Sequence, residues 1–165
     1  MKQRVAVAFT GPSGSGKTTL IEKVAKCLIT QESVAIIKHD PKDKARFDVE
    51  GKDSDKFSKT GAEVVVTSPT RTTYLSQRSK SLEEIVQLLN PFDILLVEGL
   101  KTLPLPRIAI FRGAIEASYL PHSEAIAIDE SINIADYTIP EGVAILDLND
   151  TVQIIDWIKH HAKEI

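Results

Sequence analysis

Residues 11–18 carry the pattern with the clearest capacity for chemistry. The stretch GPSGSGKT matches G-x-x-x-x-G-K-[ST], in which glycines let the backbone approach a phosphate and N–H groups point at the anion. Lys17 would bring a positive charge to the β- and γ-phosphate oxygens, and Thr18 would offer a hydroxyl to Mg²⁺. The alternative is a glycine- and serine-rich turn with a chance lysine. An apolar run before the pattern and a helical run after it favour phosphate binding.

A second candidate for chemistry is the carboxylate of Glu98. It closes the apolar run DILLVE and is followed at once by Gly99. Nucleotide sites of this kind usually place a carboxylate near the magnesium, at the end of a strand beside the phosphate-loop strand. The alternative is a strand-end glutamate that only faces water. Asp93 begins the same run, so we expect it at the opposite end of the strand, on the surface.

The elements that must position these groups can be predicted from hydrophobic periodicity. Residues 5–9 and 33–37 read as buried strands, and the helical spacing of apolar residues from Thr18 to Leu28 predicts a helix between them. Strand, helix and strand form a βαβ unit with parallel strands. Further buried strands are expected at 93–98, 107–111, 125–128 and 143–146, and Asn149 or Asp150 should cap a final helix.

The middle of the chain is more polar. The charged stretch 38–56 precedes a short predicted helix that ends near Gly61, with Asp53 or Ser54 as its N-cap. Residues 63–67 form a strand candidate, and 70–77 an edge strand or hairpin arm. Ser81 and Glu84 form a capping box before another helix. Together the patterns predict an α/β class chain, with one nucleotide-binding domain over residues 1–165.

Composition excludes several classes of protein. The net charge is −3, which argues against a dedicated nucleic-acid binder. Cys27 is the only cysteine, so an intrachain disulfide and a cysteine-rich zinc site are excluded; it lies beside the apolar stripe of the first helix and is expected to pack there. No apolar run approaches the length of a membrane span. We therefore expect a cytoplasmic protein that binds neither membrane nor nucleic acid.

The phosphate loop leaves the reaction open. An NKxD base-reading motif is absent, and the D-x-x-G spelling at 48–51 follows no apolar strand. The arginines are scattered and form no evident lid, which disfavours a nucleotide-monophosphate kinase, yet a small-molecule kinase using ATP remains an alternative. A metallochaperone GTPase is a third, although His39 and Cys27 lie far apart in sequence. Residues 128–134 and 147–149 are candidates for base reading by position only.

Several segments together carry a resemblance to one family. GPSGSGKTTL, IKHD, FDVEGKDS with KTGA, LLVEGLK and ILDLND occur in this order and cover nearly the whole chain. In this combination the sequence resembles the molybdopterin-guanine dinucleotide biosynthesis adaptor protein B family. Two departures are evident: Asp40, Pro41 and Lys42 stand where the family commonly has further histidines, and Leu100 stands where it commonly has phenylalanine.

The resemblance implies a three-layer P-loop NTPase-like fold with a mainly parallel sheet, plus a polar edge strand or hairpin. It implies GTP and Mg²⁺ as ligands, at most weak GTPase activity, a homodimer, and a molybdopterin guanylyltransferase as partner, with direct contact to molybdopterin left open. Glu98 and Asp40 are matched as carboxylates around Mg²⁺, together with Thr18, and as the groups for hydrolysis. The residues matched to phosphate binding are Gly11, Ser13, Gly14, Ser15, Gly16, Lys17, Thr18 and Thr19.

Overall fold

The computed structural model describes residues 3–89 and 91–165, and its backbone contacts divide the chain into two compact units. The first unit comprises residues 1–39 and 91–165, and the second comprises residues 40–90. The single nucleotide-binding domain over residues 1–165 stays a prediction. In the described residues, no helix has both the length and the apolar character needed to cross a membrane.

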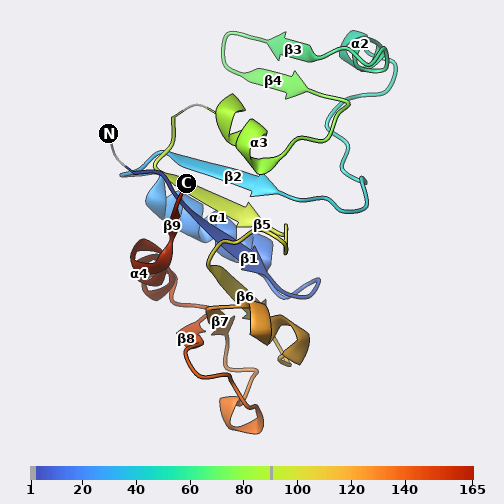
Figure 1. Cartoon of the computed structure of the whole chain (residues 1–165). Helices are drawn as coiled ribbons and strands as arrows, with labels where there is room; N and C mark the ends of the chain where they lie inside the picture. The colour runs from blue at the N-terminus through green and yellow to red at the C-terminus, as the bar shows by residue number, and fades with distance from the viewer. Residues whose placement is uncertain (1–2, 90) are drawn as a thin grey trace. The chain divides into compact units, whose positions relative to one another are not determined.

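The first unit is built on a parallel sheet with the strand order β2-β5-β1-β6-β7-β8 (Figure 1). β1 (Val5–Thr10) lies between β5 (Ile94–Glu98) and β6 (Arg107–Phe111), and all three are almost wholly buried. β2 (Val34–Lys38) pairs with β5, while β7 (Ala125–Ile128) and β8 (Ala144–Asp147) extend the sheet beyond β6. This is the predicted α/β fold with a parallel sheet. The short strand β9 (Lys163–Glu164) pairs antiparallel with β1 and was not predicted.

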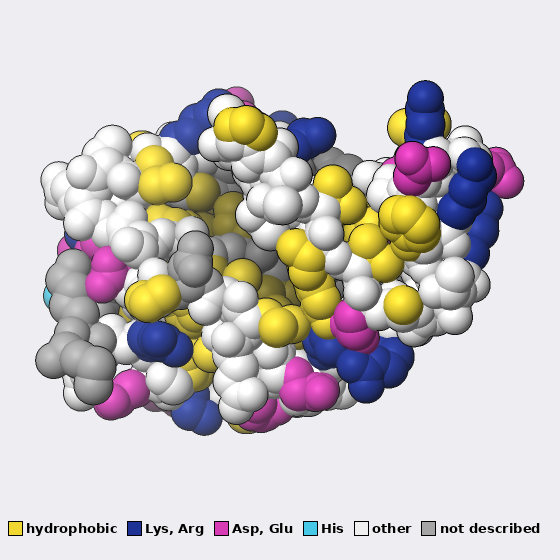
Figure 2. Space-filling model, turned by 90° about the horizontal axis from the view of Figure 1, so that it is seen from above, with side chains coloured by type: hydrophobic (Ala, Val, Ile, Leu, Met, Phe, Trp, Pro, Cys, Tyr) yellow, Lys and Arg dark blue, Asp and Glu magenta, His cyan; other side chains and the backbone are white. Residues whose placement is uncertain are grey.

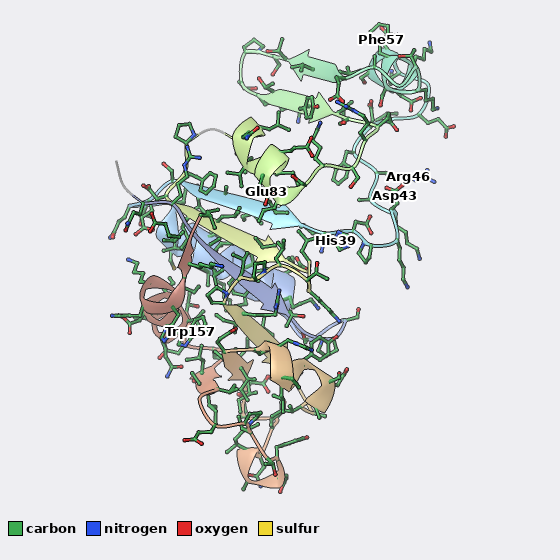
Figure 3. The ribbon with its side chains drawn as sticks, in the orientation of Figure 1. His39, Asp43, Arg46, Phe57, Glu83 and Trp157 are labelled. Atoms are coloured by element: carbon green, nitrogen blue, oxygen red, sulfur yellow. The ribbon has the colours of Figure 1, made fainter. Side chains whose placement is uncertain are left out.

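Helices α1 (Lys17–Leu28) and α4 (Thr151–His161) cover one face of this sheet. Their buried side chains meet the strand residues that point to that face, and Trp157 of α4 belongs to this core (Figure 3). The predicted cap is Asp150, whose carboxylate accepts a hydrogen bond from the Gln153 N–H at 2.9 Å. On the opposite face, a smaller core forms under η1 (Ala117–His122) and the loop that includes η2 (Ile134–Asp136); it contains Ala109, Phe111, Ile115, Leu120, Ile126 and Ile132.

The second unit contains α2 (Asp53–Ser58), an antiparallel hairpin of β3 (Val64–Thr67) and β4 (Thr72–Leu75), and α3 (Leu82–Leu88). The predicted hairpin arm is confirmed, because Val65 pairs with Tyr74 across the two strands. The Ser81–Glu84 capping box is also confirmed at α3. Several large hydrophobic side chains of this unit are exposed: Phe47, Val49, Phe57, Val65, Val66, Tyr74 and Leu88. Figure 2 shows hydrophobic side chains beside charged ones on the face that is seen from above.

Two local predictions are wrong. The N-cap of α2 is Lys52 rather than Asp53 or Ser54, and no side chain caps it. The carboxylate of Asp55 instead reaches back to the Gly51 N–H at 2.8 Å, which satisfies a backbone donor ahead of the helix. Cys27 is exposed rather than packed in the core. Its position beside the apolar stripe of α1 places it at the boundary of that stripe, where the helix surface turns toward water.

Candidate functional site

The phosphate loop connects β1 to α1, as the sequence predicts. Gly11 begins the loop with φ of 135°, and a Cβ at this position would lie 2.4 Å from the backbone carbonyl oxygen of Ile110 in the neighbouring strand β6. A contact of this length with a backbone atom is not tolerated, so residue 11 has to be glycine. The loop can therefore leave β1 close to β6 and turn back into the helix.

The loop ends at Gly16, which caps α1 in a left-handed conformation with φ of 98°. The first N–H groups of a helix have no acceptor within the helix, and the helix dipole adds partial positive charge at this end. The hydroxyl of Ser15 is buried and has no hydrogen-bond partner within the described part of the chain. A buried hydroxyl at the helix start needs a hydrogen-bond acceptor, and a phosphate oxygen that reached it would accept a hydrogen bond from it.

The Lys17 side chain folds back over the loop. Its ammonium donates hydrogen bonds to the carbonyl oxygens of Gly11 at 2.9 Å and Pro12 at 2.7 Å. Partial burial lowers the pKa of Lys17, Glu98 opposes this shift, and the positive charges of Lys38 and Lys101 lower the pKa further. Lys17 is thus surrounded by other cations, an electrostatic setting that favours a polyanionic ligand.

Glu98 lies at the carboxyl end of β5, opposite Phe9 of β1 and Lys38 of β2 in the strand register. Its carboxylate accepts a hydrogen bond from the Lys38 ammonium at 2.9 Å, and its side chain is only 12% exposed. This ion pair was not predicted from sequence, since it depends on the pairing of two strands 60 residues apart.

Gly99 allows the chain to pass close to the end of β2. It has φ of 88°, and a Cβ there would lie 3.0 Å from the Cβ of His39. His39 lies at the end of β2 (Figure 3), where its N–H donates to the Glu98 carbonyl oxygen at 2.9 Å. The glycine after Glu98 therefore has a structural explanation, which is independent of any role of the carboxylate itself.

The donors near Glu98 suit Mg²⁺. Thr18, Lys38 and Glu98 line one cavity of about 350 Å³ between α1 and β2. Most of the cavity is lined by apolar side chains, including Ile21, Ile29 and Ile36, and the oxygens it offers beside the loop are the Thr18 hydroxyl and the Glu98 carboxylate. Mg²⁺ prefers oxygen ligands and is usually held by one or two carboxylates plus phosphates and waters. Within residues 3–89 and 91–165, no group of three or more His, Cys, Asp or Glu side chains is arranged to hold a metal ion.

Asp40 is the first residue of the second unit. Its carboxylate accepts backbone hydrogen bonds from Lys44 at 2.7 Å, Ala45 at 2.6 Å and Lys42 at 3.3 Å. These bonds organise the turn after β2. They assign Asp40 a local structural role, and its role at Mg²⁺ stays a prediction.

Arg112 lies beside the phosphate loop, although the sequence alone placed it among scattered arginines. A Cβ on Gly16 would lie 3.4 Å from its Nε and 3.6 Å from its Cζ. Its Nε also lies 3.4 Å from a carboxylate oxygen of Asp129, which follows β7. A usable signal was present, because Arg112 directly follows a buried strand at the carboxyl edge of the sheet, where ligands of α/β proteins bind.

The two segments proposed for base reading meet at the ends of β7 and β8. The Asn149 amide donates to the Glu130 carboxylate at 3.3 Å, and the Asp147 carboxylate accepts from the Asn149 N–H at 2.8 Å. Both segments therefore lie at the same edge of the sheet as the phosphate loop.

Comparisons with known proteins identify the family. Residues 6–131 match the model of the MobB family, described as molybdopterin guanine dinucleotide synthesis protein B. The chain is 33% identical over 164 residues to a molybdopterin-guanine dinucleotide biosynthesis adapter protein of Haemophilus influenzae, covering 94% of this chain and 89% of the relative. It is 32% identical over 162 residues to the adapter protein of Escherichia coli, covering 92% of this chain and 90% of that relative.

The fold agrees with solved structures. MobB of Bacillus subtilis aligns with a TM-score of 0.75 at 24% sequence identity, over 96% of this chain and 98% of the other. At this identity the likeness shows the fold, while the family rests on the sequence matches. The suspected resemblance is confirmed: the chain belongs to the molybdopterin guanine dinucleotide synthesis protein B family.

Proposed function

We propose that this protein is a GTP-binding adaptor of molybdenum cofactor biosynthesis. In this role it assists the guanylyltransferase that converts molybdopterin to molybdopterin guanine dinucleotide. The observation that carries the proposal is a phosphate loop at the amino end of α1, with Lys17 above it and Glu98 at the adjacent strand end, in a chain of this family. The printed names of the relatives describe adapters of this biosynthesis.

The phosphate-binding residues in this proposal are Gly11, Ser13, Gly14, Ser15, Gly16, Lys17, Thr18 and Thr19. On nucleotide binding, the Lys17 ammonium exchanges its two carbonyl acceptors for phosphate oxygens. Thr18 and Glu98 would hold Mg²⁺ directly or through water, and Asp40, the first residue of the second unit, is kept as a further carboxylate on the family resemblance alone. The ion neutralises phosphate charge when bound.

We further propose that GTP hydrolysis is slow. Water attacks the γ-phosphorus, the bond to the β–γ bridging oxygen breaks, and GDP and phosphate leave. Glu98 would orient the attacking water, and its hydrogen bond from the Lys38 ammonium at 2.9 Å would compete with that role. Low turnover suits an adaptor whose nucleotide state, rather than its reaction rate, is read by a partner enzyme.

A panel of nucleotides tests this proposal. Calorimetric titration with GTP, GDP, ATP and ADP, each with and without Mg²⁺, should give tighter binding of the guanine nucleotides and little phosphate release from GTP. Capture of a molybdopterin guanylyltransferase by the immobilised protein is the second measurement. Preference for ATP with rapid phosphate transfer to a metabolite would contradict the adaptor and support a small-molecule kinase.

A further inference from the structure

The guanidinium of Arg112 presents one face to the phosphate loop. From the position of a Cβ on Gly16, its Nε, Cζ and Nη2 atoms lie at 3.4, 3.6 and 3.7 Å. Nearly equal distances to these three atoms mean that Gly16 stands over the plane of the group rather than at its edge. The Arg112 side chain remains 48% exposed, so a planar ligand has access to the guanidinium.

An ion pair with Asp129 holds this guanidinium in place, and hydrogen bonds through Ser131 hold Asp129. Asp129 lies 3.4 Å from the Arg112 Nε, and its other oxygen accepts hydrogen bonds from the N–H and the hydroxyl of Ser131. Ser131 in turn accepts from the Gly113 N–H at 2.8 Å. The Ser131 hydrogen bond lowers the pKa of Asp129, and the charge of Arg112 adds to that effect, so the carboxylate keeps its charge. The ends of β6 and β7 are thereby joined around Arg112.

Strand order indicates which part of a nucleotide reaches Arg112. Glu98 and Lys38 belong to β5 and β2, on one side of the phosphate-loop strand β1. Arg112 and Asp129 follow β6 and β7, on the other side of β1. A nucleotide whose terminal phosphate and metal lie beside Glu98 must extend its nucleoside across the loop toward β6 and β7.

We propose that Arg112 is the platform on which the nucleobase stacks, with one guanidinium face against Gly16 and the opposite face against the base. This inference rests on the proposed nucleotide-binding function and adds the position of the nucleoside. A guanidinium is planar and stacks on aromatic faces, whereas an ammonium does not. Stacking is tolerant of base identity, since every base has a π-face. Arg112 therefore supplies affinity, and selectivity among bases comes from other residues.

The test separates contacts to the base from contacts to phosphate. Dissociation constants for GDP, ADP and tripolyphosphate are measured by calorimetry for the wild type, Arg112→Ala, Arg112→Lys and the control Arg71→Ala, which removes an exposed arginine of the second unit. Arg112→Ala should weaken GDP by about tenfold and ADP in the same proportion, and leave tripolyphosphate unchanged. Arg112→Lys should remain weakened because the plane is lost. Thermal unfolding of each variant reports on its fold.

The outcomes distinguish this inference from the proposed function. If Arg112→Ala weakened the binding of GDP and tripolyphosphate equally, Arg112 would be a phosphate ligand, and the proposed stacking on the base would be wrong. Unchanged GDP affinity in Arg112→Ala, with normal wild-type binding, would overturn it as well. A wild type that binds no nucleotide would reject the proposed function itself. Asp129→Asn, which weakens the hold on the guanidinium, should give a smaller loss for GDP than Arg112→Ala and none for tripolyphosphate.

Discussion

Charge at the nucleotide site is concentrated on a few side chains. The positive charges of Lys38 and Lys101 act on Lys17, and Glu98 is the carboxylate that opposes their effect. Lys101 also lies 4.5 Å from the ring centre of Tyr119. With more positive than negative charge among these groups, a bound polyphosphate would relieve repulsion among the lysines. Two substitutions address this balance.

Replacing Lys17 with alanine should weaken nucleotide binding while the fold is kept. The ammonium is tied to loop carbonyls rather than to the core, so its removal leaves the packing of α1 unchanged. We expect a loss of at least about tenfold in GTP affinity, typical of a charge-assisted contact to phosphate. Titration calorimetry measures it, with Lys23→Ala on the exposed side of α1 as control. Equal affinity in both variants would reject the phosphate-loop assignment.

Replacing Glu98 with glutamine should reduce the effect of Mg²⁺ more than it reduces metal-free nucleotide affinity. The change removes the negative charge that a hard cation requires and keeps the shape of the side chain. GTP affinity is compared at several Mg²⁺ concentrations and in EDTA, with the exposed Glu116→Gln as control. If Glu98→Gln changes neither the Mg²⁺ dependence nor the metal-free GTP affinity, Glu98 has only a structural role, in its ion pair with Lys38.

Among the elements, the β1–loop–α1 segment contains the glycine with the least room for a side chain, Gly11. Its three glycines all have positive φ, and Gly11 and Gly14 differ in what surrounds them. Gly11 is confined by the Ile110 carbonyl oxygen, whereas a Cβ on Gly14 would meet nothing within 4 Å. The two positions therefore form a matched pair.

We expect Gly11→Ala to destabilise the protein more than Gly14→Ala. A Cβ at residue 11 would lie 2.4 Å from a backbone oxygen, so β1 and β6 would have to separate. At residue 14, where φ is 76°, only the left-handed strain of about 1–2 kcal/mol applies. Denaturant unfolding of both variants measures the difference. Equal unfolding free energies would mean that the loop relaxes without moving β6.

In the whole molecule, apolar exposure is concentrated in the second unit. The outer hairpin residues Val65 and Val66 are 60% and 42% exposed, and Phe57 of α2 is 59% exposed (Figure 3). Side chains of this size commonly mark an interface when they cluster. We therefore propose that the homodimer implied by the family resemblance forms with the second unit contributing to the contact.

Charged substitutions in the second unit should reduce dimer formation. Val65→Lys or Phe57→Glu would place a charge where a subunit contact buries apolar surface, at a cost of several kcal/mol. Light scattering after size-exclusion chromatography should report a smaller mass for these variants than for the wild type. Val152→Lys is the control, since Val152 is 78% exposed on α4 of the first unit. A monomeric wild type would contradict the proposed homodimer.

The predictions that succeeded were those encoded by residues close together in the chain. The phosphate loop follows from eight consecutive residues, the caps at Ser81 and Asp150 from short-range hydrogen bonds, and the parallel strands from compact apolar runs. The start of α2 at Lys52 also depends on nearby residues, but it was missed. There the carboxylate of Asp55, one turn inside the helix, accepts the hydrogen bond from the Gly51 N–H.

By itself, the sequence determined the α/β class, the phosphate loop and the end of the strand that carries Glu98, because each depends on local pattern and hydrophobic period. Only the tertiary structure decided which strands are neighbours. That order joins Lys38 to Glu98, brings Ile110 against Gly11, and sets Arg112 against Gly16 with Asp129 behind it. These contacts link residues far apart in the chain through strand register, and no local pattern encodes a register between distant strands.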